Sequence, residues 1–279
     1  MEIGARLHHL QLQSPGPEAV ARFYARVYGM QVRPDAGTWH CAGPGRQLLI
    51  GTGAINRLGY SAFAFDDPAA LAAYRRRVEA ATAVRSNPSP LFDASAFSVL
   101  DPHGNCVAFG VAPGAQLAAP APATGAAPPI RLQHFALRST LPADLLPFYR
   151  DVLGFIVSDR VIDDTGRLRA CFLRTDVEHH ALAIFDASAA CHDHLSFETS
   201  DWTALRDWAD RVAALRVPII WGVGRHGPGN DVFFMVRDPD GNLAEISAEI
   251  EVCAPGRAEG TWPHEQRTLN LWGQAIMRT

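Results

Sequence analysis

The chain contains no lysine: all 25 of its positively charged side chains are arginines. Lysine forms Schiff bases with carbonyl substrates and contacts the phosphates in P-loop nucleotide sites, so its absence excludes both chemistries. The formal net charge of -4 leaves no basic excess with which to bind a polyanion. We therefore expect no nucleic-acid partner.

Cysteine is sparse, and long apolar runs are missing. The five cysteines are an odd number and form no CxxC pair, which is typical of reduced thiols in a cytoplasmic protein rather than of disulfides or a zinc site. No stretch approaches the roughly 20 apolar residues of a membrane-spanning helix, and the first residues do not form a signal peptide. We expect a cytoplasmic protein without membrane contact.

The two sides of an Ala- and Pro-rich segment repeat each other. Residues 113–129 are almost entirely Ala, Pro and Gly, and we interpret them as a linker. The stretch RLHHLQL before the linker matches RLQHFAL after it, and FYARVYGM matches FYRDVLGF at the same spacing. Later, DPHGNCVAF matches DPDGNLAEI, with about a dozen extra residues in the second copy. The chain is therefore an internal duplication.

Each half shows one order of elements twice. In the second half, strands are predicted at 132–138, 169–175, 179–186, 194–200, 231–238 and 243–250, and helices at 141–154 and 201–216. Asp201 is the predicted N-cap of the later helix, and Gly154 suits the end of the earlier one. This order predicts an α+β fold of two tandem domains, 1–112 and 130–250. Each domain holds two βαβββ modules that form a partly open barrel around a pocket, and a tail, 251–279, follows.

Four such modules, with polar residues at strand ends, resemble the vicinal oxygen chelate superfamily. The chain is more closely similar to its type I extradiol ring-cleaving dioxygenases over about residues 1–250. The most specific match is GVGRHGPGNDVFFMVRDPDGNLAEI, at 222–246. The resemblance implies a non-haem iron(II) site in the second half, with His134, His194 and Glu245 as its ligands. Manganese(II) is the alternative ion, because a mixed nitrogen and oxygen site discriminates weakly between the two.

This ligand set also suits the chemistry. Two imidazoles and one carboxylate on one face of a metal leave adjacent positions open for both oxygens of a diol and for dioxygen. The repeat provides an internal comparison. The first half keeps His9, but Ala62 is expected in the place of His194 and Ala108 in the place of Glu245. We therefore expect the first half to bind no metal.

The resemblance to the extradiol dioxygenases also implies roles for side chains other than the metal ligands. His180 takes the place of an acid/base residue, and His226 that of a histidine that hydrogen-bonds a substrate hydroxyl. Neutral imidazole exchanges protons near pH 7, which suits both roles. Asp231 and Met235 are expected to line the substrate pocket, and Met235 stands where the family usually has a tyrosine. The other histidines of interest are expected to be neighbours or structural residues: His8, His40, His103, His179 and His192.

The sequence thus predicts an extradiol dioxygenase that uses iron(II) and dioxygen to cleave the ring of a catechol-type diol, and we expect a homo-oligomer. Two alternatives are a metal-dependent glyoxalase-like isomerase or lyase, which usually has two glutamates in its metal site, and a binding protein for aromatic ligands. The complete set of His134, His194 and Glu245 argues against the binding protein. The tail is expected to pack either on the second half or on a neighbouring subunit.

Overall fold

The computed structural model describes residues 2–112 and 127–278, so 113–126 of the expected linker lie outside the described residues. The elements of the first half are β1 (Arg6–Ser14), α1 (Pro17–Tyr28), β2 (Gln31–Asp35), β3 (Thr38–Gly43), β4 (Arg46–Thr52), β5 (Arg57–Phe65), α2 (Pro68–Glu79), β6 (Arg85–Ser86), β7 (Phe97–Leu100) and β8 (Cys106–Val111). Those of the second half are β9 (Arg131–Ser139), α3 (Pro142–Pro147), the π-helical turn η1 (Phe148–Val152), β10 (Ile156–Ile162), β11 (Leu168–Arg174), β12 (Leu182–Asp186), β13 (Cys191–Thr199), α4 (Trp202–Ala214), β14 (Trp221–Arg225), β15 (Val232–Arg237) and β16 (Leu243–Ala248). The tail adds β17 (Gly260–Pro263) and α5 (Gln266–Leu269).

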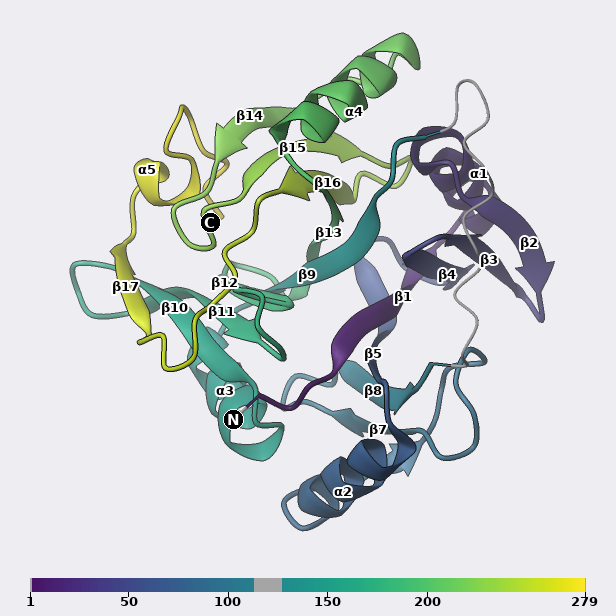
Figure 1. The fold of residues 1–279 in the computed structure, drawn as a ribbon, viewed down its shortest axis with the longest axis vertical. Coiled ribbons are helices and arrows are strands. Elements are labelled where there is room, and N and C mark those ends of the chain that lie inside the picture. Colours follow the sequence, from purple (N-terminus) through teal and green to yellow (C-terminus); the bar gives the residue numbers. More distant parts are fainter. Residues whose placement is uncertain (1, 113–126, 279) are drawn as a thin grey trace.

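Each half forms one curved sheet built from two modules (Figure 1). In the first sheet the order is β2-β3-β4-β1-β5-β8-β7-β6, and in the second it is β14-β15-β16-β13-β9-β12-β11-β10-β17. The opening strands of the two modules pair antiparallel at the centre, as β1 with β5 and β9 with β13. Each opening strand also pairs in parallel with the last strand of its own module. The predicted α+β class is confirmed.

Local sequence signals explain where the helices begin and end. Asp201 caps α4 as predicted, because its carboxylate accepts a hydrogen bond from the backbone N–H of Ala204. Gly154 follows the end of η1 with a φ of 73°, a left-handed conformation that glycine adopts without steric cost. Pro147 interrupts the preceding helix because it lacks a backbone N–H. The chain then continues as the π-helical turn η1, where the Leu153 N–H donates to the carbonyl of Phe148, five residues earlier.

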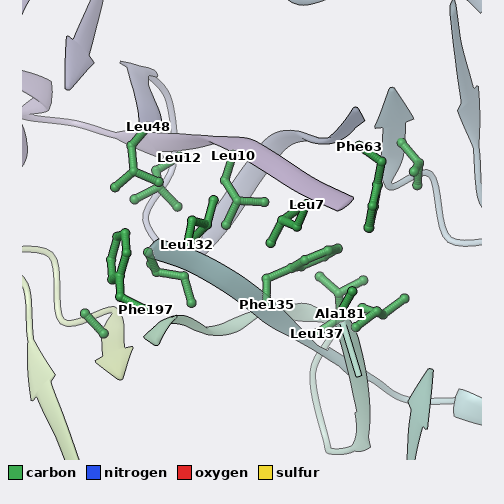
Figure 2. Packing of buried hydrophobic residues seen from close by; sticks show 14 of the residues in the cluster. Leu7, Leu10, Leu12, Leu48, Phe63, Leu132, Phe135, Leu137, Ala181 and Phe197 are labelled. Atoms are coloured by element: carbon green, nitrogen blue, oxygen red, sulfur yellow. The ribbon is translucent and has the colours of Figure 1, made fainter. Parts of the chain in front are cut away.

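The two halves share one hydrophobic core. Leu10 and Leu12 of β1 face Leu132 and Phe135 of β9 across the boundary between the halves (Figure 2). At the same boundary, the ring centroid of Phe63 lies 5.3 Å from that of Phe155. The halves therefore bury apolar surface against each other, and each depends on the other for stability.

The tail packs on the second half. Its strand β17 extends the second sheet by pairing in parallel with β10, at the edge where the yellow ribbon runs in Figure 1. The indole N–H of Trp262 on β17 donates to a carboxylate oxygen of Asp159 on β10 at 2.7 Å. The sequence left open whether the tail packs on the second half or on a neighbouring subunit. In the structure it packs on the second half of its own chain. In the described part of the chain, no helix is long and apolar enough to span a membrane.

The shared core predicts that a cavity in the first half destabilises both halves. Phe63→Ala should lower the free energy of unfolding by about 3–5 kcal/mol, as expected for a fully buried aromatic ring. Five of the six tryptophans belong to the second half or the tail, so fluorescence reports mainly on that side. In denaturant titrations, fluorescence and circular dichroism should shift together to a lower midpoint. Ile55→Ala, at a half-exposed position, should shift neither signal. A shift in circular dichroism alone would show that the halves unfold independently.

Candidate metal centre

His134, His194 and Glu245 lie together on neighbouring strands of the second sheet. They come from β9, β13 and β16, and the backbone register places Ser196 of β13 opposite both His134 and Glu245. The Nε2 atoms of the two histidines are 3.2 Å apart, and Nε2 of His134 is 3.5 Å from Oε1 of Glu245. All three side chains are buried. Their ligand atoms are close enough together to hold one metal ion.

The hydrogen bonds behind the two histidines direct their Nε2 atoms toward each other. Nδ1 of His194 lies 2.6 Å from Oδ1 of Asp193, and Nδ1 of His134 contacts the side-chain oxygen of Gln133. A carboxylate or amide oxygen only accepts, so each Nδ1 carries a proton and each Nε2 is the nitrogen left to bind a metal. The two Nε2 atoms face each other at 3.2 Å, where one bound cation would accept a lone pair from each. The geometry therefore fits a metal.

The charges of the ligand group fit a divalent cation as well. Burial, together with the neighbouring imidazoles, lowers the pKa of His134 well below its usual value, so its ring is neutral. Burial alone would raise the pKa of Glu245, but the contact with His226 and a hydrogen bond from Ser196 hold it below the usual value. The anionic carboxylate of Glu245 and the neutral ring of His134 thus suit a metal ligand set, which binds through unprotonated atoms.

The first half differs from the second at the corresponding positions, and the sequence comparison misplaced one of them. His9 pairs across the sheet with Ala62, just as His134 pairs with Ser196. Ala62 therefore corresponds to Ser196, and Tyr60 takes the place of His194. The expectation that Ala62 takes that place is wrong, because strand pairing sets the correspondence and sequence spacing does not reveal it. Ala108 lies in register with Ala62, just as Glu245 lies in register with Ser196. Ala108 therefore does correspond to Glu245, as expected.

His9 is also occupied by other partners. Its Nε2 lies 2.7 Å from the Ser89 hydroxyl, and its Nδ1 lies 2.7 Å from Nδ1 of His8. Among the described residues, the groups able to hold a metal ion all belong to the second half. The first half contributes residues to the shared hydrophobic core.

A small cavity adjoins the ligand group. Its walls are mostly apolar and include Phe172, Phe185, Trp221, Met235 and Leu269. Met235 lies opposite Glu245 in the pairing of β15 with β16, which explains why its side chain lines this cavity. The cavity has the apolar character of a small-molecule site, with a few polar groups at one side.

His180 and His226 both reach this cavity. His180 precedes β12, and its ring centroid is 4.3 Å from that of His134. His226 follows β14, stacks on Phe233, and directs its Nε2 toward Oε2 of Glu245 at 3.4 Å. Its Nδ1 donates to the backbone carbonyl of Leu269, a tail residue, at 2.6 Å.

Asp231 is fully buried near His226 and Glu245, close enough to form a second potential ligand group with them. Burial raises the pKa of Asp231 to about 7. His192 is buried too, but it does not belong to either group.

Sequence reasoning missed the support behind His180. His179 is completely buried, and its Nδ1 lies 3.0 Å from Nδ1 of His180. Its Nε2 lies 3.1 Å from a carboxylate oxygen of Asp159, which also pairs with Arg257 of the tail at 2.9 Å. The HH doublet was the available signal, whereas nothing in the sequence points to Asp159 or Arg257. His179 is thus a neighbour of the site, and it connects His180 to the tail.

Comparisons with known proteins agree with this geometry. Residues 131–246 match the model of the Glyoxalase/Bleomycin resistance protein/Dioxygenase superfamily. Metapyrocatechase 2 of Cupriavidus necator is 28% identical over 97% of this chain and 89% of the relative. Biphenyl-2,3-diol 1,2-dioxygenase 3 of Rhodococcus globerulus is 29% identical over 43% of this chain and 63% of the relative.

Solved structures show the same fold over nearly the whole chain. The Mn(II)-bound glyoxalase of Novosphingobium aromaticivorans has a TM-score of 0.79 and 26% identity, and covers 96% of this chain and 91% of its own. Homoprotocatechuate 2,3-dioxygenase of Arthrobacter globiformis has a TM-score of 0.80 and 22% identity, and covers 98% and 88%. The duplicated modules and the buried ligand group agree with this likeness to the Glyoxalase/Bleomycin resistance protein/Dioxygenase superfamily, whose model matches residues 131–246.

Proposed function

We propose that this protein is an extradiol dioxygenase that opens the aromatic ring of a catechol-type diol with dioxygen at a non-haem iron(II). The observation that carries the proposal is the buried group of His134, His194 and Glu245 beside an apolar cavity that His180 and His226 also line. A relative that spans nearly the whole chain is named a metapyrocatechase, and a second is named a biphenyl-2,3-diol dioxygenase.

Iron(II) held by His134, His194 and Glu245 supplies chelation of the two diol oxygens and activation of dioxygen. The protein supplies proton transfer and a dry cavity. Burial keeps the pKa of His180 well below its usual value, so its neutral ring can take a proton from a substrate hydroxyl. With its Nδ1 engaged by His179, Nε2 is the nitrogen available for that transfer. The proton can return to the product from the same atom, and the apolar walls exclude water throughout.

The cavity favours a neutral diol with an apolar substituent. Arg278 is the one permanently charged side chain among the described residues that line it, and its charge is paired with Asp193. Met235 offers a polarizable thioether surface and no hydrogen-bond donor. A substituent that meets these walls gains apolar contact, whereas an anionic one finds no free cation there.

Manganese(II) can occupy the same ligand set, as the weak selectivity of mixed nitrogen and oxygen sites allows. A second candidate function follows from the likeness to a manganese-bound glyoxalase: a metal-dependent isomerase or lyase that uses no dioxygen. An oxygen electrode separates the two functions. The proposed dioxygenase consumes one dioxygen per catechol and forms a coloured ring-opened product, and the isomerase does neither.

Removing a ligand should remove the metal. Protein prepared without oxygen should bind one iron(II) per chain, and His134→Ala, His194→Ala and Glu245→Ala should each lose stoichiometric iron because two donors cannot hold it. His9→Gln is the matched control in the first half and should keep full occupancy. Elemental analysis and anaerobic titration measure both results. Iron at one per chain in Glu245→Ala would refute this ligand assignment.

Removing the proposed proton-transfer groups should spare the metal. His180→Gln and His226→Gln should keep iron but lose ring cleavage by roughly 10²-fold or more, the usual contribution of a positioned acid/base group. Single-turnover measurements on iron-loaded protein compare the rates directly. Loss of iron in both variants would instead assign these histidines to metal binding.

Met235 should determine substrate preference. Because its side chain lines the cavity opposite Glu245, Met235→Tyr should raise kcat/KM for unsubstituted catechol relative to an alkyl- or aryl-substituted catechol. Iron occupancy should stay the same. An identical ratio of the two kcat/KM values in both proteins would show that residue 235 does not contact the substrate.

A further inference from the structure

Asp193 is a fully buried carboxylate next to a proposed metal ligand. It precedes His194 on β13 and accepts a hydrogen bond from Nδ1 of that histidine at 2.6 Å. A buried carboxylate is costly unless charged partners compensate it. Two arginines do so here, Arg138 of β9 and Arg278 of the tail.

Arg278 forms the more complete of the two interactions. Its Nε donates to Oδ2 of Asp193 at 3.0 Å and its second terminal nitrogen donates to Oδ1 at 2.6 Å, so both carboxylate oxygens are engaged. This two-point geometry fixes the plane of the carboxylate. Arg138 contacts one oxygen, at 2.6 Å, and a third of its side chain is exposed.

The Arg278 guanidinium is also part of the cavity wall. Its central carbon lies 4.4 Å from the ring centroid of Phe185 and 5.2 Å from that of Trp221. Trp221 in turn holds the tail, because its indole N–H donates to the Gln274 carbonyl at 3.0 Å. Arg278, which is 85 residues from Asp193 in sequence, thus both lines the cavity and binds the carboxylate that hydrogen-bonds His194.

The metal-free half lacks this arrangement. Because Tyr60 corresponds to His194 in the strand register, Gly59 corresponds to Asp193. A side chain at residue 59 would have to displace the side chain of Gln11, since an added Cβ would lie 2.0 Å from its amide oxygen. The carboxylate therefore occurs in the half that carries the ligand group and is missing from the half that does not.

We propose that Arg278 is a positioning residue for the metal centre: by fixing Asp193, it holds the ring of His194 with Nε2 directed at the metal. The tail thereby completes the metal site from a distant part of the chain. This inference rests on the proposed role of His194 as a ligand. Loss of such outer partners typically weakens metal binding about 10–100-fold.

The test measures metal affinity, which does not require turnover. Manganese(II) is titrated without oxygen into the full-length protein and into Arg278→Met, which fills similar space without the charge or the donors. The dissociation constant should rise about 10–100-fold in Arg278→Met. Arg278→Lys should restore part of the affinity, because it keeps the charge without the planar fork. Arg267→Met, at an exposed tail arginine, should bind like the parent.

A double-variant cycle separates positioning from a general loss of structure. Asp193→Asn should also weaken manganese binding, and adding Arg278→Met to it should weaken binding little further, because both changes interrupt the same connection. Cobalt(II) bound to Arg278→Met should show an altered visible spectrum, which reports ligand orientation. If Arg278→Met does not fold, Arg278→Lys and Asp193→Asn supply the same comparison.

The possible failures can be told apart. Parent-like affinity and cobalt spectrum in Arg278→Met, or additive losses in the double variant, would overturn the role of Arg278 while leaving the metal site intact. If the parent protein binds no manganese, iron or cobalt, the proposed metal centre fails and this inference fails with it.

Discussion

The antiparallel pairing of β9 with β13 is the constraint on which the rest of the site depends. It joins the two modules of the second half, and it brings His134 and His194 from opposite strands to a separation of 3.2 Å between their Nε2 atoms. The parallel pairing of β13 with β16 then adds Glu245 from the next strand. Because two backbone ladders fix these positions, the ligand group is preorganised and needs little rearrangement to accept an ion.

The same pairing exists in the first half without the same chemistry. There β1 and β5 place His9 opposite Ala62, and Ser89 and His8 engage the two nitrogens of His9. The two halves thus have similar sheets. The second sheet carries the ligand group, whereas the first contributes residues to the hydrophobic core. The packing of Phe63 against Phe155 buries apolar surface of both halves, so the first half contributes to the stability of the half that carries the ligand group.

The tail connects to the site in two places. Through Trp262 and Arg257 it reaches Asp159, behind His179 and His180. Through Arg278 it reaches Asp193, behind His194. Both connections run through a buried carboxylate that faces a histidine. Such carboxylates are stable in a dry interior only when several donors surround them, so the tail stabilises the protein and the arrangement of the site at once.

The sequence by itself determined the fold class, the duplication and the helix ends, because repeats, periodicity and capping residues such as Asp201 and Gly154 act locally. The resemblance to extradiol dioxygenases also predicted that His134, His194 and Glu245 gather in one place, and the structure brings them together. The ligand roles themselves stay predictions.

Only the tertiary structure decided the correspondence of Tyr60 with His194, since the two halves have different lengths of chain between their paired strands and only the strand register aligns them. Tertiary structure alone also brought Arg278 to Asp193. Contacts between residues so far apart depend on how the whole chain packs, and a single sequence carries no local signal for them.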